Sequence, residues 1–334
     1  MVMNNIVRAL DKNEYELWDK IVTESQHGTI FHESWWLSAC SQLLNKEFKI
    51  FGYFENEELL GGFSVFLSKY LSLKIASSTV PTVPYGGLVI APSHHGNVKE
   101  EEEKYFRIAE ALIKSNDFDN IQLTNAPGLV DLRPFTWNSW DTGVRYTYYL
   151  NPSDDLKKPN RNVRRMINKA VESGIIEKKL QTPDSNHYAL FKETYSRKNL
   201  GAPVEEPFFD AMIRLLLSKN RGELWVAENP GGECAASDII IYDSKRAYRW
   251  LAASHTEFRK SGAVSLLLSE ILRELGKKGV REINLMTANN PTLSRFTSNF
   301  NPILVPYYTT ETRSYLLDSM SNTKRLLTNF HFKS

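Results

Sequence analysis

Residues 246–272, RAYRWLAASHTEFRKSGAVSLLLSEIL, decide the fold. The stretch Arg246–Ser254 is rich in aromatic and apolar residues and predicts a β-strand. A polar turn leads to Gly262, and the apolar residues of 262–276 then recur at helical spacing. The first N–H groups of a helix lack partners and attract anions, so this turn is a candidate anion site. An ordinary helix cap at Ser261 explains the same residues.

The order of elements around this stretch occurs twice in the chain. In the first half, helices are predicted over 13–25 and 34–44, a hairpin within 48–67, a strand over 84–90, a helix over 99–115 and a strand over 120–125. In the second half, helices are predicted over 186–199 and 207–218, a hairpin within 223–242, a strand over 246–254, a helix over 262–276 and a strand over 282–287. Hairpins break any strict strand–helix alternation, which disfavours a Rossmann or barrel fold. The pattern predicts an α/β protein with a mixed sheet, in two domains of residues 1–150 and 151–334 that meet near the polar segment 151–160. A single large domain with unrelated halves is the alternative.

Composition narrows the class of protein. The 334 residues are 42% hydrophobic and 24% charged with a net charge of +2, which is typical of a globular protein. Cys40 and Cys234 have neither a zinc-site nor a disulfide spacing, so we expect reduced thiols in a cytoplasmic protein. No apolar run approaches the ~20 residues of a membrane span, and no metalloprotease-type motif is present. We therefore expect no integral membrane segment and no metal.

One segment is strongly basic. Residues 157–169, KKPNRNVRRMINK, contain six Lys or Arg and no acid. On a helix, Arg161, Arg165 and Lys169 recur every four residues on one face, and Arg164 lies beside them. Like charges at this spacing repel each other, so such a face favours an anionic ligand, although a solvated surface has the same pattern.

The second half resembles the GNAT acyltransferase superfamily over residues 174–318. The matching order is strand, two helices, hairpin, strand, helix, strand, the short helix PTLSRFTSN, and the paired strands ILVPYYT and TRSYLL. The doubled arrangement resembles Fem-type peptidoglycan aminoacyltransferases and FemAB-like or BioF2-like acetyltransferases. YGGLVI (85–90) and the basic segment 156–175 resemble further motifs of these proteins. The resemblance implies two tandem GNAT-like domains, the first non-catalytic, with Tyr85 and the basic residues Arg161, Arg164 and Arg165 contacting the substrate.

The resemblance also implies a place for the acyl donor. The superfamily holds the pyrophosphate of acyl-CoA on a turn of the form [QR]-x-x-G-x-[GA], which Arg259 and Gly262 match and Val264 does not. The acyl arm pairs with the preceding strand, here at backbone of Leu251 to Ser254. Donor contacts are therefore expected from Leu251, Ser254, Arg259, Ser261, Gly262, Ala263 and Val264. Acyl-CoA, such as acetyl-CoA, and aminoacyl-tRNA are both candidate donors.

Catalytic residues are harder to place. Many GNAT enzymes use a tyrosine to protonate the leaving group, but that position is Phe296 here, and Thr297 stands where Fem-type proteins have lysine. Tyr307 and Tyr308 are possible replacements. The candidate bases that would take the proton of an attacking amine are Asp238 and His255.

Two functions follow as expectations. The first is an N-acyltransferase that moves an acetyl or aminoacyl group onto an amine of a sugar, a peptide or a cell-envelope precursor. The alternative is a catalytically silent GNAT-fold module that binds a phosphorylated glycan or nucleic acid, which Val264, Phe296 and Thr297 favour.

Overall fold

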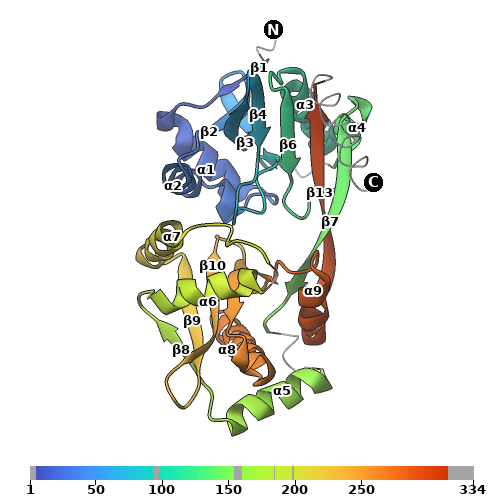
Figure 1. The fold of residues 1–334 in the computed structure, drawn as a ribbon. Helices are drawn as coiled ribbons and strands as arrows, with labels where there is room; N and C mark the ends of the chain where they lie inside the picture. The colour runs from blue at the N-terminus through green and yellow to red at the C-terminus, as the bar shows by residue number, and fades with distance from the viewer. Residues whose placement is uncertain (1–4, 94–97, 154–159, 184, 198, 315–334) are drawn as a thin grey trace, which may run out of the picture. The chain divides into compact units, whose positions relative to one another are not determined.

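A computed structural model describes residues 5–93, 98–153, 160–183, 185–197 and 199–314 (Figure 1). The chain divides into two compact units. Unit 1 runs to Arg145 and resumes at Tyr307, and unit 2 is Tyr146–Pro306. The sequence-based division at 150/151 therefore differs from the structural one mainly at the C-terminal end of the chain. Part of the predicted boundary segment, 154–159, lies outside the described residues.

Unit 1 has helices on a mixed sheet. Its strands are β1 (Asn5–Ala9), β2 (Phe48–Glu55), β3 (Glu58–Tyr70), β4 (Leu73–Ser77), β5 (Val89–Ile90), β6 (Asn120–Thr124), the first half of β7 (Asp141–Leu150) and most of β13 (Ile303–Arg313). Its helices are α1 (Tyr15–Glu24), α2 (Ser34–Leu44), α3 (Val98–Lys114) and α4 (Arg133–Trp137), with short 3-10 turns at Lys12–Glu14 and Ile30–His32. The apolar side of α3, including Ile108 and Leu112, packs on Tyr53, Val65 and Ile121 of the sheet.

Unit 2 repeats this plan. Its strands are the end of β7, β8 (Ile176–Leu180), β9 (Gly222–Glu228), β10 (Cys234–Tyr242), β11 (Ala247–Ser254) and β12 (Ile283–Asn284). Its helices are α5 (Arg161–Glu172), α6 (Ser185–Ser196), α7 (Glu206–Ser218), α8 (Ala263–Lys277) and α9 (Pro291–Thr297), with 3-10 turns η4 (Glu257–Lys260) and η5 (Ser298–Phe300). Leu267 and Leu272 of α8 are fully buried against β9, β10 and α5, in one core cluster with Trp225, Ile240 and Val163. The predicted mixed α/β architecture is confirmed.

The prediction from the sequence placed one strand of unit 1 wrongly. Residues 84–90 were expected to form the strand that corresponds to β11, but only Val89–Ile90 are extended in β5. β4 holds that position instead, because it pairs in parallel with β6 as β11 pairs in parallel with β12. The YGG residues approach other backbone closely: a Cβ on Gly87 would overlap the side chain of Asn125, whose Oδ1 accepts a hydrogen bond from Leu88 N at 3.0 Å.

The end of the chain also differs from the prediction. Residues 303–313 form one continuous strand, not the first strand and turn of a hairpin, and residues 315–317 of the expected partner lie outside the described residues. The sequence from Tyr307 to Arg313 has no Gly, Pro or Asn to turn the chain. In unit 1, Thr309–Arg313 of β13 pair antiparallel with β6, and in unit 2, Tyr149 and Leu150 of β7 pair antiparallel with β12.

Candidate active site

The strands β11 and β12 of unit 2 separate after two residue pairs. Their parallel register joins Ala247 with Ile283 and Tyr248 with Asn284, and goes no further. On its other edge, β11 stays paired with β10 as far as Ser254. Ile240 pairs with Arg249 and Ile239 with Leu251, so Trp250 is an extra residue that forms a bulge in β11. A bulge of this kind increases the local twist of a strand. The second half of β11 therefore has an edge that β12 does not cover.

Asn284 and Met286 end β12. Met286 has a left-handed backbone with φ of 56°, which an extended strand cannot continue through. The fully buried Asn284 accepts hydrogen bonds from Met286 N at 3.0 Å and Thr147 Oγ1 at 2.6 Å. A buried polar side chain that has such partners fixes the local backbone, so the separation of the two strands is built into unit 2.

Helix α6 supplies polar side chains to the end of β11. Arg197 Nη1 donates to the carbonyl oxygen of Ser254 at 2.6 Å and to Thr256 Oγ1 at 3.1 Å. The Ser254 carbonyl bonds to Arg197, directly after α6, and points away from β10, because the next amide, His255 N, donates to Ala235 of β10. Strand residues alternate in the direction of their backbone groups, so the N–H and C=O of Ala252 point to the same uncovered edge. Of the expected region Leu251–Ser254, Ala252 is thus the residue whose backbone the edge presents.

Glu193 of α6 is the acid nearest to this edge. One carboxylate oxygen accepts from Thr256 N at 2.9 Å and from the Thr256 hydroxyl. The other lies 4.0 Å from Nε2 of His255. Burial would raise the pKa of Glu193, but the hydrogen bonds from Thr256 and the charges of His255 and Arg197 lower it overall. Glu193 is therefore an anion at neutral pH.

His255 follows β11 directly. Its Nδ1 accepts a long hydrogen bond of 3.3 Å from Glu257 N, and its ring lies 5.3 Å from that of Phe258. In this arrangement the neutral ring carries its proton on Nε2, toward Glu193, as assigned from the hydrogen-bond partners. Nδ1 is then the basic nitrogen, and its bond to the backbone is weak enough to be exchanged.

The turn before α8 is covered by α5. Gly262 has φ of 94°, and a Cβ there would overlap the carbonyl oxygen of Met166 and press on Ala170. Lys169 Nζ also donates to the carbonyl oxygen of Lys260 at 2.6 Å. Glycine is thus required at position 262 both by its backbone conformation and by the packing of α5.

Several amides of this turn already have partners. Ala263 N donates to Ser261 Oγ at 3.2 Å, and the N–H groups of Ser265 and Leu266 both donate to the Gly262 carbonyl. The N-cap of α8 is Gly262 and not the expected Ser261, although the Ser261 hydroxyl bonds to the first amide of the helix. Val264, which departs from the GNAT pattern, packs against the core cluster of unit 2. Backbone N–H groups at this helix start offer an anion less than the sequence pattern suggests.

Exposed cationic side chains lie on α5 and on the turn before α8. Arg161, Arg164 and Arg165 of α5 are exposed, and no described residue forms an ion pair with them. Arg259 and Lys260 of η4 are exposed as well. Burial lowers the pKa of Arg197, and the nearby charge of Arg259 lowers it further, although Glu193 opposes this. We call Arg161, Arg164, Arg165, Lys169, Arg259 and Lys260 the basic surface.

Asp238 and Arg249 form a buried ion pair between β10 and β11. Both carboxylate oxygens accept from Arg249, at 2.9 Å from Nε and 2.8 Å from Nη2, and Asp238 is 1% exposed. Burial raises the pKa of Asp238, while the Arg249 charge lowers it. No described hydrogen bond or ion pair joins Asp238 to His255, so the structure does not bring the two predicted bases together.

Helix α9 carries aromatic packing where the GNAT tyrosine is expected. Phe296 lies 5.4 Å from the ring of Phe300 and 5.9 Å from the Arg249 guanidinium, and Thr297 is fully buried against Thr287. Tyr148 of β7 brings a phenol to this helix, since its hydroxyl lies 2.9 Å from Ser294 Oγ. Tyr307 and Tyr308, which the sequence suggested as replacements for the missing tyrosine, belong to unit 1. There the ring centroid of Tyr307 lies 5.2 Å from that of the buried Tyr85.

Comparisons with known proteins agree with this fold. Residues 157–292 match a family model described as an acetyltransferase (GNAT) domain. We call residues 157–292 the GNAT domain, after the family model that they match. Three solved structures share the fold across both units. FemX has a TM-score of 0.65 and 11% identity, with 91% of this chain and 96% of that chain covered. A tandem GNAT protein from the clavulanic acid biosynthesis pathway has a TM-score of 0.56 and 10% identity, with coverage of 92% and 98%, and L-PGS from Bacillus licheniformis has a TM-score of 0.55 and 12% identity, with coverage of 95% and 97%. A search of curated proteins found no match.

The GNAT domain therefore contains the predicted strand, turn and helix, with further residues that the sequence did not indicate. Sequence reasoning missed Glu193, Arg197 and Tyr148, because their partners are 57 or more positions away in the chain and no local motif marks them. Tyr85 is part of the aromatic core of unit 1, in contact with Phe31 and Tyr307, and its contact with a substrate stays a prediction. Among the described residues there is no group of His, Cys, Asp and Glu that could hold a metal ion, and no helix has the length and apolar character to cross a membrane.

Proposed function

We propose that the GNAT domain of unit 2 is an N-acyltransferase that binds a phosphate-bearing acyl donor along the uncovered edge of β11. The observation that carries this proposal is the position of the Ala252 backbone on that edge, beside Ser254, whose carbonyl bonds to Arg197 near Arg259. Backbone groups on an open strand edge can pair with the amides of an extended acyl carrier. The neighbouring cations compensate the phosphates of that carrier.

The donor's phosphates lie on the basic surface in this proposal. The start of α8 offers fewer free backbone N–H groups to an anion than the GNAT sequence pattern implies. The reasons are that α5 covers Gly262 and that Ala263 N already donates to Ser261 Oγ. Arginine side chains bind phosphate through two parallel hydrogen bonds, and the exposed arginines of α5 have no acidic partner among the described residues. From Arg161 to Lys169 the helix rises by ~12 Å, which exceeds one pyrophosphate and favours aminoacyl-tRNA over acyl-CoA.

His255 is the proposed base, and Glu193 positions it. As the amine nitrogen attacks the acyl carbon, the new C–N bond forms, Nδ1 of His255 takes the amine proton, and the bond from the acyl carbon to the carrier's oxygen or sulfur breaks. Glu193 stabilises the resulting imidazolium from the Nε2 side. The leaving group must gain a proton, and Tyr148 is the proposed source because its hydroxyl reaches α9.

The proposed acceptor is an amine of a sugar, a peptide or a cell-envelope precursor, and the protein acts in the cytoplasm. Unit 1 is the non-catalytic partner in this proposal. The first turn of its helix α3 carries Glu100 and Glu101, and acids at a helix start repel phosphate where the basic surface of unit 2 attracts it.

Donor binding is tested by thermal unfolding with acetyl-CoA, desulfo-CoA and aminoacyl-tRNA, each at 100 times its dissociation constant. A true donor adds ~2.7 kcal/mol to the stability of the native state. Transfer is then measured on wild type and His255→Gln with a panel of amines, and Glu193→Gln is compared by its pH profile. Stabilisation by a donor without amine-dependent release of its carrier would refute the enzyme and leave a binding module.

That binding module is the second candidate. The observations that favour it are Phe296 at the tyrosine position and the closed Asp238–Arg249 pair. In this case, unit 2 binds a phosphorylated glycan or nucleic acid through the basic surface and performs no transfer.

A further inference from the structure

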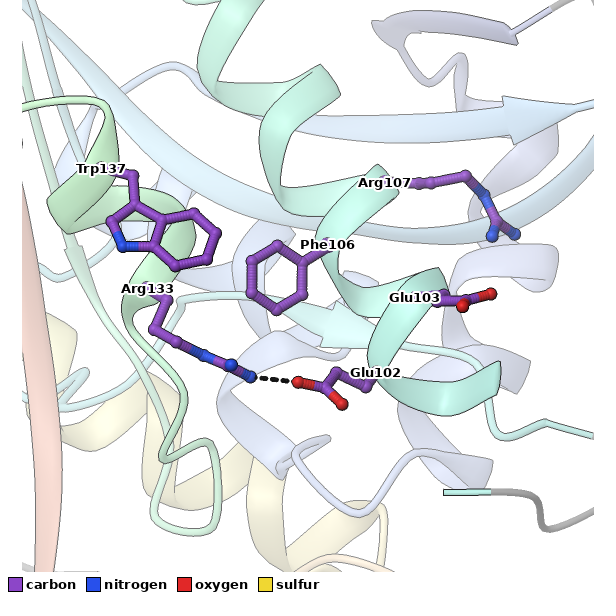
Figure 2. A pocket seen from close by; sticks show the side chains of 6 residues that line it. All are labelled: Glu102, Glu103, Phe106, Arg107, Arg133 and Trp137. Carbon is purple, nitrogen blue, oxygen red and sulfur yellow. Dashed lines mark hydrogen bonds and ion pairs between the residues drawn. The ribbon is translucent and has the colours of Figure 1, made fainter. Parts of the chain in front are cut away.

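Unit 1 has an aromatic pocket between α3 and α4, whose side chains differ in kind from those of the basic surface. Figure 2 shows its six lining side chains, which are Glu102, Glu103, Phe106, Arg107, Arg133 and Trp137. The hollow has a volume of about 500 Å³ and is open to solvent, within the ~300–1,000 Å³ typical of small-molecule sites. Trp137 is 65% exposed, which is unusual for so large an apolar side chain.

The two rings make an apolar platform. The ring centroids of Phe106 and Trp137 lie 5.3 Å apart with an angle of 40° between the planes. The guanidinium of Arg133 covers part of them, at 4.8 Å from the Phe106 centroid and 6.0 Å from that of Trp137. The exposed ring face of Trp137 is left to a ligand that has an apolar face of its own.

Charged groups around the platform form ion pairs with one another and with neighbouring residues. Arg133 bonds to both oxygens of Asp131, with Nε to Oδ1 at 2.9 Å and Nη2 to Oδ2 at 2.7 Å, and it pairs with Glu102 across the pocket (Figure 2). Its Nη1 makes no hydrogen bond to a described residue. Glu103 lies 3.7 Å from Lys99, and Arg107 lies 3.6 Å from Glu55. Donors and acceptors for hydroxyl groups therefore surround the rings, and their charges largely compensate one another.

We propose that this pocket binds a neutral carbohydrate. A pyranose ring with equatorial hydroxyls has C–H faces that stack on Trp137 and a rim of hydroxyls that bond to Arg133 Nη1 and Glu103. A free anion is disfavoured, because both guanidinium groups of the lining already pair with carboxylates, Arg133 with Glu102 and Asp131 and Arg107 with Glu55. A cation is disfavoured as well, because Arg133 already lies over the aromatic faces. The inference concerns unit 1 alone and does not depend on acyl transfer by unit 2.

The test is saturation-transfer NMR and tryptophan fluorescence of the full chain with cellotriose and N,N′-diacetylchitobiose. Wild type should bind one of these sugars through its ring C–H protons. Trp137→Ala should weaken binding roughly tenfold, and Trp137→Phe, which keeps a ring, should retain most of it. Tyr70→Ala is the matched control, since Tyr70 is an exposed aromatic residue of the same unit, outside the pocket.

Several results would overturn the proposal. One is binding of neither sugar by wild type. Another is equal binding by wild type and Trp137→Ala, with both variants folded by circular dichroism. Stronger binding of choline than of either sugar, lost in Trp137→Ala, would reassign the pocket to cations. Because none of these measurements involves acyl transfer, their failure is separate from any failure of the function proposed for unit 2.

Discussion

Gly262 packs directly against the carbonyl oxygen of Met166, which brings the turn before α8 onto the basic helix α5. The glycine that resembles a phosphate-binding motif therefore has a structural reason to be there. The same contact brings Lys169 of α5 to the backbone of Lys260, on the turn that also carries Arg259. The consequence is that phosphate recognition in unit 2 depends on side chains more than on the backbone of the turn.

The contact predicts that Gly262→Ala destabilises unit 2 strongly. The substitution adds a methyl group against Met166 at a residue with φ of 94°, and we expect a loss of about 2–4 kcal/mol. The matched control is Gly279→Ala, where φ is 76° and no atom lies within 4 Å of the added Cβ, so only the ~1 kcal/mol of backbone strain applies. Urea denaturation of both variants measures the difference. Equal losses would show that α5 does not press on the turn.

Removal of two cations from the basic surface should weaken the salt dependence of donor binding. For Arg161→Gln/Arg165→Gln, the slope of log K against log salt for tRNA should decrease by about 1.5–2, because each arginine that contacts a phosphate releases about one counterion. Arg214→Gln/Arg281→Gln removes two exposed arginines elsewhere in unit 2 and should leave the slope unchanged. An unchanged slope in both double variants would exclude α5 from the donor site.

The Asp238–Arg249 pair predicts a strong coupling between two substitutions. Asp238→Asn leaves the Arg249 charge buried without its partner and should cost about 3–5 kcal/mol. Asp238→Leu/Arg249→Met removes both charges and should cost less than Asp238→Asn alone. A double-mutant cycle of Asp238→Leu, Arg249→Met and the double variant, measured by chemical denaturation, gives this coupling. If Asp238→Asn keeps full stability but abolishes transfer, then Asp238 is a catalytic base, as the sequence suggested.

Glu223 should make unit 2 sensitive to acid. Burial would raise its pKa, but hydrogen bonds from Lys179, Lys278 and Trp225 outweigh burial and hold the pKa at about 2. Because this pKa is below the value of ~4.3 in the unfolded chain, ionised Glu223 stabilises the folded state. That stabilisation is fully present above about pH 4.3 and is lost as the pH falls toward 2. Wild type should exceed Glu223→Gln in stability by about 1–3 kcal/mol at pH 7 and by little at pH 2. Glu100→Gln, at an exposed site on α3, should cost less stability at pH 7 than Glu223→Gln. A Glu223→Gln difference that is equal at pH 7 and pH 2 would contradict the prediction.

The elements of the GNAT domain were predictable where one periodicity persists over many residues. The spacing of Leu267, Ile271 and Leu275 predicts α8, and the apolar run before Ser254 predicts β11. The short β4 was missed because Leu73–Ser77 has too few residues to establish a period of two. Nor can local periodicity tell which strands pair with each other, so the pairing of β13 with β6 was not foreseen.

The candidate site was predictable only in its local part. The turn at Gly262 and the loop histidine His255 follow from neighbouring residues in the sequence. The bulge at Trp250, which precedes the uncovered edge, cannot be predicted from the sequence, because it does not change the apolar pattern of β11. The contact of Glu193 with Thr256 joins residues 63 positions apart, and only the packing of α6 beside β11 brings them together.

Amine-dependent release of the carrier from an acyl donor tests the central claim most directly. Wild type is incubated with aminoacyl-tRNA or acetyl-CoA and a panel of sugar, peptide and envelope-precursor amines, and free tRNA or free thiol is measured. We predict release that requires an amine, decreases at least tenfold in His255→Gln, and decreases in Arg161→Gln/Arg165→Gln with recovery at low salt. Release at the same rate in wild type and His255→Gln, or no release from a donor that binds, would contradict the account.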